Sequence, residues 1–490
     1  MIAVGLMSSL ATEYDLLCEA LPAPIVQAAE LCALPHFVDD QVAYQILHDF
    51  ANLNGTARRT WAEVKRLPFV YPYEQGRWRF IDAARIHFSS RLEQNNGMYL
   101  SLHQYLVEKL EEQRRQVEDV SAPEARELEW RIAYHLAPFH PERAVERLIA
   151  FGESAAQAHQ LADVRGVIDL FEEQKRWLSG FRIERAYFEG RYAYALQNYP
   201  IAEDRFAFVW EHGRPDLMKA ISGHLLGRIL ESRGGRSRQE EAERLYGESL
   251  RLLRSIGDRR GVAMVLNSLG GVLVALGGRS RQQEAERLYR ESLRIGRELG
   301  LQRNVAMVLN SLGVVLVALG GHSRQEEAEG FYRESLRIGR ELGLQRHVAM
   351  VLNSLGGVLV ALGGRSRQQE AEDLYHGSLK LLRSIGDRRG VAMVLNSLGG
   401  LLVALGGRSR QQEAERLYRE SLKIERSIGN RRGEAMVLFR LSRLAEELRE
   451  FAQAHQYLEN VISIEAELGN LRHMEQNRRR LEELRRKLGG

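Results

Sequence analysis

A seven-residue string, Met-Val-Leu-Asn-Ser-Leu-Gly, occurs four times in the chain, and its asparagine is Asn267, Asn310, Asn353 and Asn396 in turn. The spacing is 43 residues each time, and residues 259–301 match residues 302–344 at 36 of 43 positions. Self-similarity at a fixed period is the signature of a stacked repeat array. Because such an array exposes one long surface built from recurring side chains, its usual role is to bind other molecules.

The composition is that of a folded chain with no evident catalytic or metal centre. Of the 490 residues, 44% are apolar and 27% are charged, which leaves ample surface to bury. The two cysteines, Cys18 and Cys32, cannot form a disulfide framework or a four-cysteine zinc site, so we expect buried free thiols. The histidines are scattered and no hydrolase or zinc-protease motif occurs. We therefore expect no enzyme activity, no metal and no cofactor.

Each unit contains two helical segments separated by a glycine pair. In the unit from Arg259 to Leu301 the pair is Gly277-Gly278, where the first helix can end in a left-handed conformation. Ser280, followed three residues later by Gln283, has the pattern of a capping box and predicts the start of the second helix. The sequence thus predicts a helical hairpin in every unit.

Apolar residues recur at helical spacing in both segments of this unit. The first helix carries an apolar stripe and the second a matching face, formed by Leu266, Leu269, Leu273 and Leu276, and by Ala285, Leu288, Tyr289, Leu293 and Ile295. One hairpin cannot bury both faces, so its stability must come from stacking on its neighbours.

These residues resemble the tetratricopeptide repeat family. Leu269-Gly270, Ala285 and Tyr289 occupy the family's Leu-Gly, small and aromatic positions. The period of 43 exceeds the family's usual 34, and the long repeats of kinesin light chains are the nearest comparison. The resemblance implies an all-α fold, a right-handed superhelix of helical hairpins, with seven units over residues 181–473 and a basic capping helix over 474–490.

A second stripe of the first helix, Met264, Asn267, Gly271 and Val274, is not needed for packing within the repeat. The family resemblance implies that first helices line a concave groove, so this stripe is the candidate site for a protein or peptide partner. Amides can bind a peptide backbone as donor and acceptor, and methionines give adaptable apolar contact. The candidate residues are Met264, Asn267, Met307, Asn310, Met350, Asn353, Met393 and Asn396.

Two readings of these residues stay open. The asparagines could instead hydrogen-bond a neighbouring helix, with the methionines filling gaps between repeats. A further row, Arg236, Arg279, Arg365 and Arg408, invites an anion-binding interpretation. A solvated charge row is the simpler interpretation, because each arginine lies next to a Gln- and Glu-rich helix start.

The first part of the chain predicts three short helices and a β-hairpin. The helices are expected at Ile25–Leu34, Asp39–Leu47 and Ala57–Leu67, the hairpin strands at Phe69–Tyr73 and Arg77–Ile81, and another helix at Asp82–Leu92. Three helices with such a wing resemble the winged-helix domain that follows the nucleotide-binding core in STAND signal-transduction ATPases. Residues 1–95 would be this domain and residues 96–180 the helical arm that follows it there.

No Gly-x-x-x-x-Gly-Lys-Ser/Thr motif is present, so the chain offers no phosphate cradle of its own. The resemblance therefore implies a sensor part that works with a separate NTPase or effector subunit. The alternative is a transcription regulator whose winged helix contacts DNA through Arg58, Arg59, Lys65 and Arg66. Against nucleic acid, the net charge is only +4.

We also expect a cytoplasmic protein that does not enter a membrane. The first residues carry no basic region ahead of an apolar run, and no uninterrupted apolar run approaches the roughly 18 residues of a membrane span.

Overall fold

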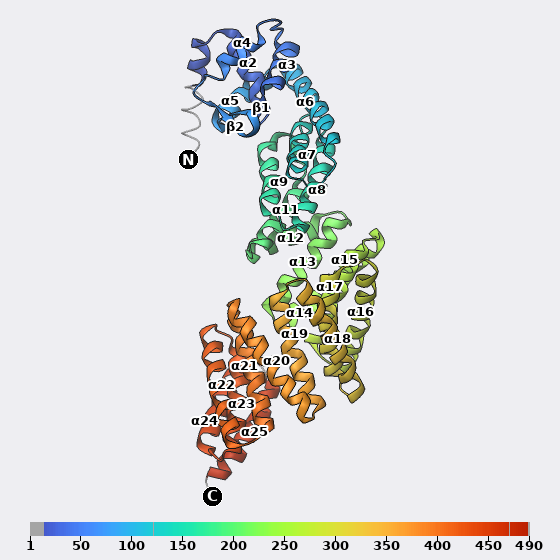
Figure 1. The fold of residues 1–490 in the computed structure, drawn as a ribbon, viewed down its shortest axis with the longest axis vertical. Coiled ribbons are helices and arrows are strands. Elements are labelled where there is room, and N and C mark those ends of the chain that lie inside the picture. Colours follow the sequence, from blue (N-terminus) through green and yellow to red (C-terminus); the bar gives the residue numbers. More distant parts are fainter. Residues whose placement is uncertain (1–13, 121, 470, 489–490) are drawn as a thin grey trace. The chain divides into compact units, whose positions relative to one another are not determined.

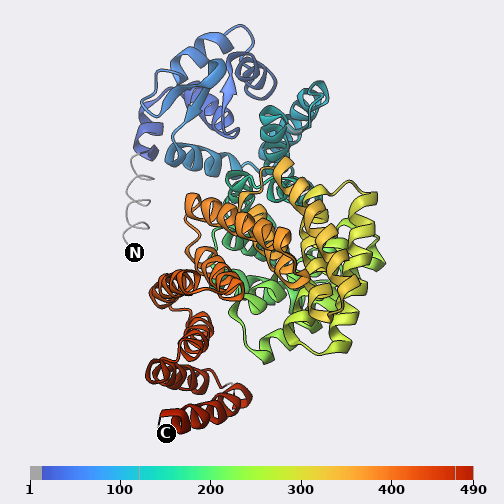
Figure 2. The ribbon, with the colours of Figure 1, turned by 60° about the horizontal axis from the view of Figure 1, so that its bottom comes forward.

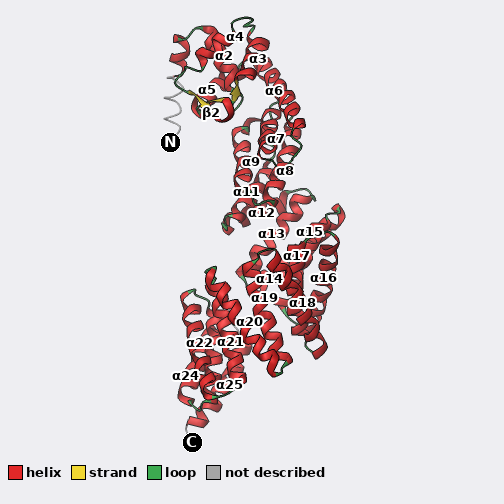
Figure 3. Cartoon of the chain, viewed as in Figure 1, coloured by secondary structure: helices red, strands yellow, loops and turns green. Residues whose placement is uncertain are grey.

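The computed structural model describes residues 14–120, 122–469 and 471–488, and these divide into two compact units, residues 1–213 and 214–490. Helices dominate both units, and the strands drawn in yellow in Figure 3 lie in the first unit. The first thirteen residues, on which the expectation of no leader rests, lie outside the described residues.

The first unit begins with short helices and a three-stranded sheet (Figure 1). Its elements are α2 (Ala23–Ala33), β1 (Val38–Asp39), α3 (Asp40–Ala51), α4 (Ala57–Val64), β2 (Val70–Tyr73), η1 (Glu74–Gly76), β3 (Arg77–Phe80) and α5 (Asp82–Glu93). The sheet is antiparallel with order β1-β3-β2, and Val70 pairs with Phe80. The predicted hairpin and helices are confirmed to within a few residues. Strand β1 was not predicted, because two residues are too few to show an alternating pattern.

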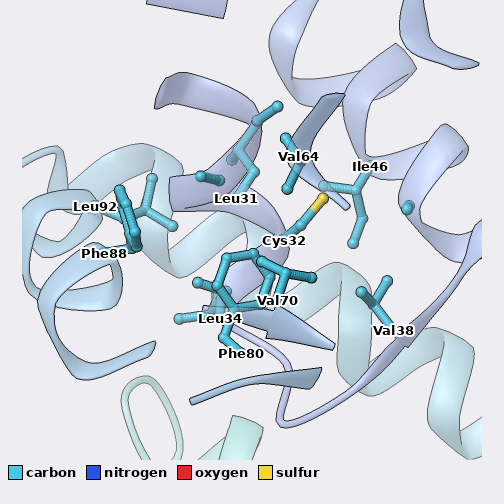
Figure 4. Close-up of a cluster of buried hydrophobic side chains, with 14 of the residues drawn as sticks. Leu31, Cys32, Leu34, Val38, Ile46, Val64, Val70, Phe80, Phe88 and Leu92 are labelled. Atoms are coloured by element: carbon cyan, nitrogen blue, oxygen red, sulfur yellow. The ribbon is translucent and has the colours of Figure 1, made fainter. Parts of the chain in front are cut away.

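The core of this region is apolar and contains one of the two thiols. Figure 4 shows Cys32 of α2 among Leu31, Ile46 and Val64. Both cysteines are free and buried, which confirms the prediction for them. Burial raises the pKa of the Cys32 thiol, since nothing near it stabilises a thiolate.

The first unit continues with α6 (Asn96–Gln116), α7 (Pro123–Leu136), α8 (Pro141–Gln157), α9 (Leu161–Glu173), α10 (Lys175–Leu178), α11 (Arg182–Ala195) and α12 (Tyr199–His212). Buried polar groups join these helices to the preceding region. The Arg85 guanidinium donates to the Tyr134 hydroxyl at 3.1 Å and to Glu173 at 3.1 Å. His36 lies 3.3 Å from the same carboxylate. A buried charge is tolerated only with partners of this kind.

Three histidines of the first unit are enclosed and kept neutral. His103 and His135 face each other with their Nδ1 atoms 3.1 Å apart. Burial lowers the pKa of His36 to about 4 and that of His103 to about 3. Burial also lowers the pKa of His135 well below its usual value. All three are therefore uncharged at neutral pH.

The second unit is a succession of helical hairpins, seen from two sides in Figures 1 and 2. We call the first helix of each hairpin the A helix and the second the B helix. The A helices are α13 (Leu217–Arg233), α15 (Arg259–Leu276), α17 (Gln302–Leu319), α19 (Gln345–Leu362), α21 (Arg388–Leu405) and α23 (Arg431–Glu447). The B helices are α14 (Arg236–Ile256), α16 (Arg279–Glu298), α18 (His322–Glu341), α20 (Arg365–Ser384), α22 (Arg408–Ser427) and α24 (Phe451–Glu467), followed by α25 (Leu471–Leu488).

Small residues and a buried hydroxyl set the packing within each hairpin. Gly270 lies against the Tyr289 ring so closely that a Cβ there would come within 2.5 Å of Cε1. The buried Ser292 hydroxyl donates to the Ala263 carbonyl at 2.7 Å. Equivalent serines make the same bond in three later hairpins, Ser335, Ser378 and Ser421. The repeated signature residues thus fix one A–B geometry throughout the array.

The predicted capping boxes are wrong. Helix α16 begins at Arg279, its N-cap is Gly278 at φ 93°, and no side chain caps it. Ser280 therefore lies within the first turn. The glycine pair, with Gly277 at φ 74°, already reverses the chain, so the helix starts before the serine. Side-chain caps occur instead on A helices: Asp258, Asp387 and Asn430 accept from the backbone N–H three residues on.

Candidate partner-binding face

One face of the A helices carries three parallel rows of recurring side chains. We call it the A-helix face. The rows are Arg260, Arg303, Arg346, Arg389 and Arg432; Met264, Met307, Met350, Met393 and Met436; and Asn267, Asn310, Asn353 and Asn396. Successive positions in one helix are four and three residues apart, so the three rows share one side of it. Successive A helices lie against one another, α15 on α17 and α17 on α19, which brings each row into register.

The methionine row is exposed, as a contact surface requires. Met264 is 42% exposed, Met307 45% and Met436 52%. The remaining two, Met350 and Met393, are half-buried. Exposed thioether side chains are adaptable apolar contacts, and a regular row of them is unusual on a surface that only faces water.

The sequence predicts that both the amide nitrogen and the amide oxygen of each asparagine face outward. The structure shows a different orientation. The Oδ1 atoms of Asn267, Asn310, Asn353 and Asn396 are buried and make no hydrogen bond within the described structure. Asn396 is 7% exposed, and its amide nitrogen contacts Met436 Sδ of the next A helix at 3.5 Å. In the other three, which are half-buried, the amide nitrogen is the polar atom left toward the surface. The row therefore presents donors.

The ends of the asparagine row differ from its middle. His224 of α13 stands 43 residues before Asn267, and its Nε2 lies 2.9 Å from the Ser268 hydroxyl. Burial lowers the pKa of His224 to about 3, so this ring is neutral. At the other end Phe439 replaces the asparagine. Four asparagines, of which Asn396 is the most buried, thus lie between two dissimilar ends.

Sequence analysis missed the arginine row. Its signal was available, because arginine recurs at the same place in five copies, 43 residues apart. Arg346 forms an ion pair with Asp387 at 2.8 Å. Arg303, Arg389 and Arg432 are exposed and form no ion pair with any described residue. This row lies one helical turn from the methionines.

The arginine row that the sequence did suggest lies elsewhere. Arg236, Arg279, Arg365 and Arg408 are each the first residue of a B helix. Arg236 pairs with Glu240 on its own helix at 3.0 Å. These arginines are exposed and do not belong to the A-helix face, which agrees with a solvated charge row.

The B helices carry charges of both signs that pair between repeats. Arg290 reaches Glu327 at 2.8 Å, and Arg297 reaches Glu334 at 2.8 Å. Helices α15, α17, α19 and α21, by contrast, contain no aspartate or glutamate. The two sides of the array therefore differ in character. Charges pair between repeats on the B helices, whereas Arg303, Arg389 and Arg432 of the A-helix face form no ion pair with a described residue.

The four residues of the DNA-binding alternative do not form a uniform basic patch. Lys65 pairs with Asp40 at 3.0 Å and lies 4.8 Å from the Trp78 ring. Arg66 pairs with Glu63 at 2.9 Å. Arg58 lies 5.5 Å from the Tyr44 ring centre, and Arg59 is exposed on α4. Two of the four cations are thus already neutralised by carboxylates.

An open cavity of about 340 Å³ lies between α7, α8 and α9, beside Trp130 and Phe151. Its charged wall residues include an internal ion pair, in which Arg126 lies 2.8 Å from Asp163. Among the described residues, no group of three or more His, Cys, Asp or Glu side chains is arranged to hold a metal ion. The cavity is therefore a weaker candidate for a binding site than the A-helix face.

Three A helices are long and apolar enough to cross a membrane by length and composition alone: Arg259–Leu276, Gln302–Leu319 and Arg388–Leu405. Small and polar residues interrupt the apolar run of each of these helices, so the finding concerns their length and mean hydropathy only. In the array, 39% to 56% of each segment is buried against neighbouring helices. Their apolar stripe is used for packing between hairpins.

Several solved structures are similar to the chain. A STAND protein with a tetratricopeptide repeat sensor from Pyrococcus horikoshii matches with a TM-score of 0.54 and 13% identity, over 96% of this chain and 67% of that one. BtubC from P. vanneervenii matches at 0.36 and 21% identity, over 51% of this chain and 92% of its own. A Rap protein complexed with Competence and Sporulation Factor matches at 0.43 and 16%, over 72% and 99%.

No protein-family model and no curated protein matches the chain in sequence. The stacked hairpins and the structural neighbours together show an all-α tetratricopeptide-type solenoid, as the repeat signature predicted. At these identities the likeness concerns the fold.

Proposed function

We propose that the chain is a non-enzymatic interaction scaffold or sensor that binds a peptide or partner protein in a concave groove lined by the A-helix face. The observation that carries the proposal is the methionine row, whose members are exposed or half-buried, flanked on α15, α17 and α19 by an asparagine whose amide nitrogen faces outward. Folding alone does not require such a surface, since the leucine stripe already packs the hairpins.

Within this proposal, the chain is the sensor part of a cytoplasmic STAND-type signalling or defence system. Residues 1–95 would form a winged-helix domain, residues 96–180 a helical arm, residues 181–473 seven repeats and residues 474–490 a basic cap. The order α2-β1-α3-α4-β2-β3 with its three-stranded sheet supports the winged-helix assignment. A separate NTPase or effector subunit would supply the phosphate chemistry that this sequence lacks.

The alternative of a DNA-binding transcription regulator has less support. It depends on a basic recognition helix, and the ion pairs of Lys65 and Arg66 leave only Arg58 and Arg59 for phosphate contact. Non-specific duplex binding needs several such contacts at physiological salt.

A double substitution tests the proposed face. Asn310→Ala with Asn353→Ala should weaken capture of the native partner in a pull-down by about tenfold, because two bonds of roughly 0.7 kcal/mol each are lost. Folding should not suffer, since each change removes a buried oxygen that makes no hydrogen bond.

The matched control removes two side chains from the B helices. Arg287 and Arg340 are exposed and form no ion pair with described residues, so Arg287→Ala with Arg340→Ala should leave capture unchanged. Far-UV circular dichroism checks that both variants keep their helix content. Equal capture by the asparagine variant and the wild type would remove the A-helix face from the proposal.

A further inference from the structure

We propose that the partner is a polypeptide whose carboxylates recur at every third residue, lying across the A helices in a polyproline II-like conformation. This inference rests on the proposed binding at the A-helix face and specifies the partner's chemistry. Four observations carry it: the sign of the charges, the absence of outward-facing acceptors on the rows, the identity of the copies and the spacing of the helices.

The face attracts anions and repels cations. Helices α15, α17, α19 and α21 contain no acidic residue, and Arg303, Arg389 and Arg432 are exposed without an ion pair among the described residues. Guanidinium groups in this state favour carboxylates, which they can bind with two parallel hydrogen bonds.

The polar groups of the rows are donors. The guanidinium groups cannot accept a hydrogen bond, and the asparagine oxygens are buried. The hydroxyls of Ser311 and Ser354, which lie beside the rows, donate their protons to the Met307 and Met350 carbonyls and are not part of this donor set. A partner must therefore be rich in acceptors, such as carboxylates and backbone carbonyls, and the methionine row adds an apolar requirement between them.

The copies are nearly identical, so the partner must be repetitive to use all of them. The rows place the same arginine, methionine and asparagine on each of four successive A helices. A group bound by one copy therefore meets the same residue types in the next copy, although the Arg346 guanidinium already pairs with Asp387. A partner with a single acidic residue would engage one copy and leave the others empty, whereas a periodic chain gains one equivalent contact with each repeat.

The helix spacing sets the period of the partner. Successive A helices are in contact, and packed helices have axes about 8–10 Å apart. A polyproline II chain rises about 3.1 Å per residue with three residues per turn, so every third side chain points the same way at intervals of about 9.3 Å. A β-strand would place every third side chain on the opposite side. Carboxylates at every third residue therefore match the arginine row.

A single-stranded nucleic acid fits the face less well, although it is also a periodic anion. Proteins that bind single strands combine positive charge with aromatic side chains on which bases stack. Helices α15, α17, α19 and α21 contain no Phe, Tyr or Trp. The apolar row consists of methionines, which suit aliphatic side chains.

Fluorescence anisotropy with synthetic peptides tests the period. The probes are labelled (Pro-Leu-Glu)n with n from 1 to 4, and isomers of the same length and composition with all glutamates clustered at one end. We expect affinity to rise about threefold with each added unit, the effect of one exposed ion pair with its apolar contact. The clustered isomers should show no such rise. Equal binding by the two series would overturn the inference.

Charge-matched variants locate the binding. Arg303→Ala with Arg389→Ala should lower the affinity for the n = 4 peptide about tenfold, because two of its ion pairs are lost. Arg287→Ala with Arg340→Ala removes the same charge from the B helices and should change nothing. An oligothymidine of twelve nucleotides that bound as tightly as the peptide, through the same arginines, would also overturn the inference.

The same proteins separate this inference from the proposed function. If the asparagine variant loses its native partner but the periodic peptides do not bind, only the period is wrong. If neither the native partner nor any peptide depends on the A-helix face, the proposed function fails with it.

Discussion

The two compact units achieve stability by opposite means. The second unit repeats one solution, an A helix lying on a B helix through a glycine and a tyrosine, so that no position is exceptional. The first unit is built once. Its interior holds Arg85 and three histidines, and the Arg85 guanidinium reaches the exposed Glu173 carboxylate. Repetition favours apolar contacts that are the same in every copy. An interior that occurs once can hold a buried charge that depends on one specific partner.

The largest expected difference between the units is their response to acid. His36, His103 and His135 titrate near pH 6.5 when unfolded. In the folded state, burial lowers the pKa of His36 to about 4, that of His103 to about 3 and that of His135 well below its usual value. Between these limits the unfolded chain binds more protons, so stability is full above pH 6.5 and falls as the pH drops. Each histidine contributes about 1.4 kcal/mol per pH unit in that window.

Tryptophan fluorescence separates the units in this experiment, because all five tryptophans lie in residues 1–213. Lowering the pH from 7 to 5 should reduce the urea midpoint of the fluorescence transition strongly. The loss of helix in the second unit, followed by circular dichroism, should shift less with pH. Among the described residues of that unit, the histidines with a lowered pKa are His224 and His347. Equal shifts in both signals would contradict the proposed role of the buried histidines.

The next largest effect concerns the repeated glycine. Gly356→Ala would place a Cβ 2.8 Å from Tyr375 Cε1, so the ring or the helix must move, at a cost of about 1–3 kcal/mol. Gly357→Ala is the matched control. Its Cβ would meet only the Tyr375 hydroxyl at 3.8 Å, and alanine should stabilise the helix by up to about 1 kcal/mol.

Urea unfolding followed by circular dichroism measures both substitutions. Because the two glycines are adjacent in one helix, a shared effect of helix propensity would move both midpoints in the same direction. We expect Gly356→Ala to lower the urea midpoint and Gly357→Ala to raise it. A stabilising Gly356→Ala would mean that the glycine–tyrosine contact does not set the hairpin geometry.

The smallest effect is that of a single helix cap. Asp258 accepts a hydrogen bond from the Gly261 N–H at 2.9 Å at the start of α15, and Asp258→Ala should cost about 1 kcal/mol. Asp258→Asn should be nearly neutral, since Asn430 caps α23 in the same way. A loss of equal size in both variants would point to the charge of Asp258, not the cap, as the stabilising element.

The comparison also explains what could be predicted from the sequence. The hairpins and the all-α fold followed from residues that recur at fixed intervals. The capping boxes failed because the glycine pair starts the helix one residue before Ser280. The Arg85–Glu173 contact joins residues 88 apart, and no periodic pattern signals such a pair.

The candidate site was predicted in part. The methionine and asparagine rows came from helical spacing, which says which side of a helix a residue occupies. Spacing cannot say which end of an amide is buried, and that orientation came only from the packing of successive A helices. The arginine row was overlooked because it lies at the extreme start of each A helix, outside the apolar pattern.

The equivalence of the junctions between repeats has an evolutionary consequence. Leu301 precedes α17 as Leu344 precedes α19, and the residue that follows is glutamine in both places. Excision of residues 302–344 would join Leu301 to Gln345 and recreate a connection that the chain already contains. Copy number can therefore change by recombination between misaligned copies, because adding or removing a repeat requires no new contact. The proposed binding face would lengthen or shorten by one repeat at a time.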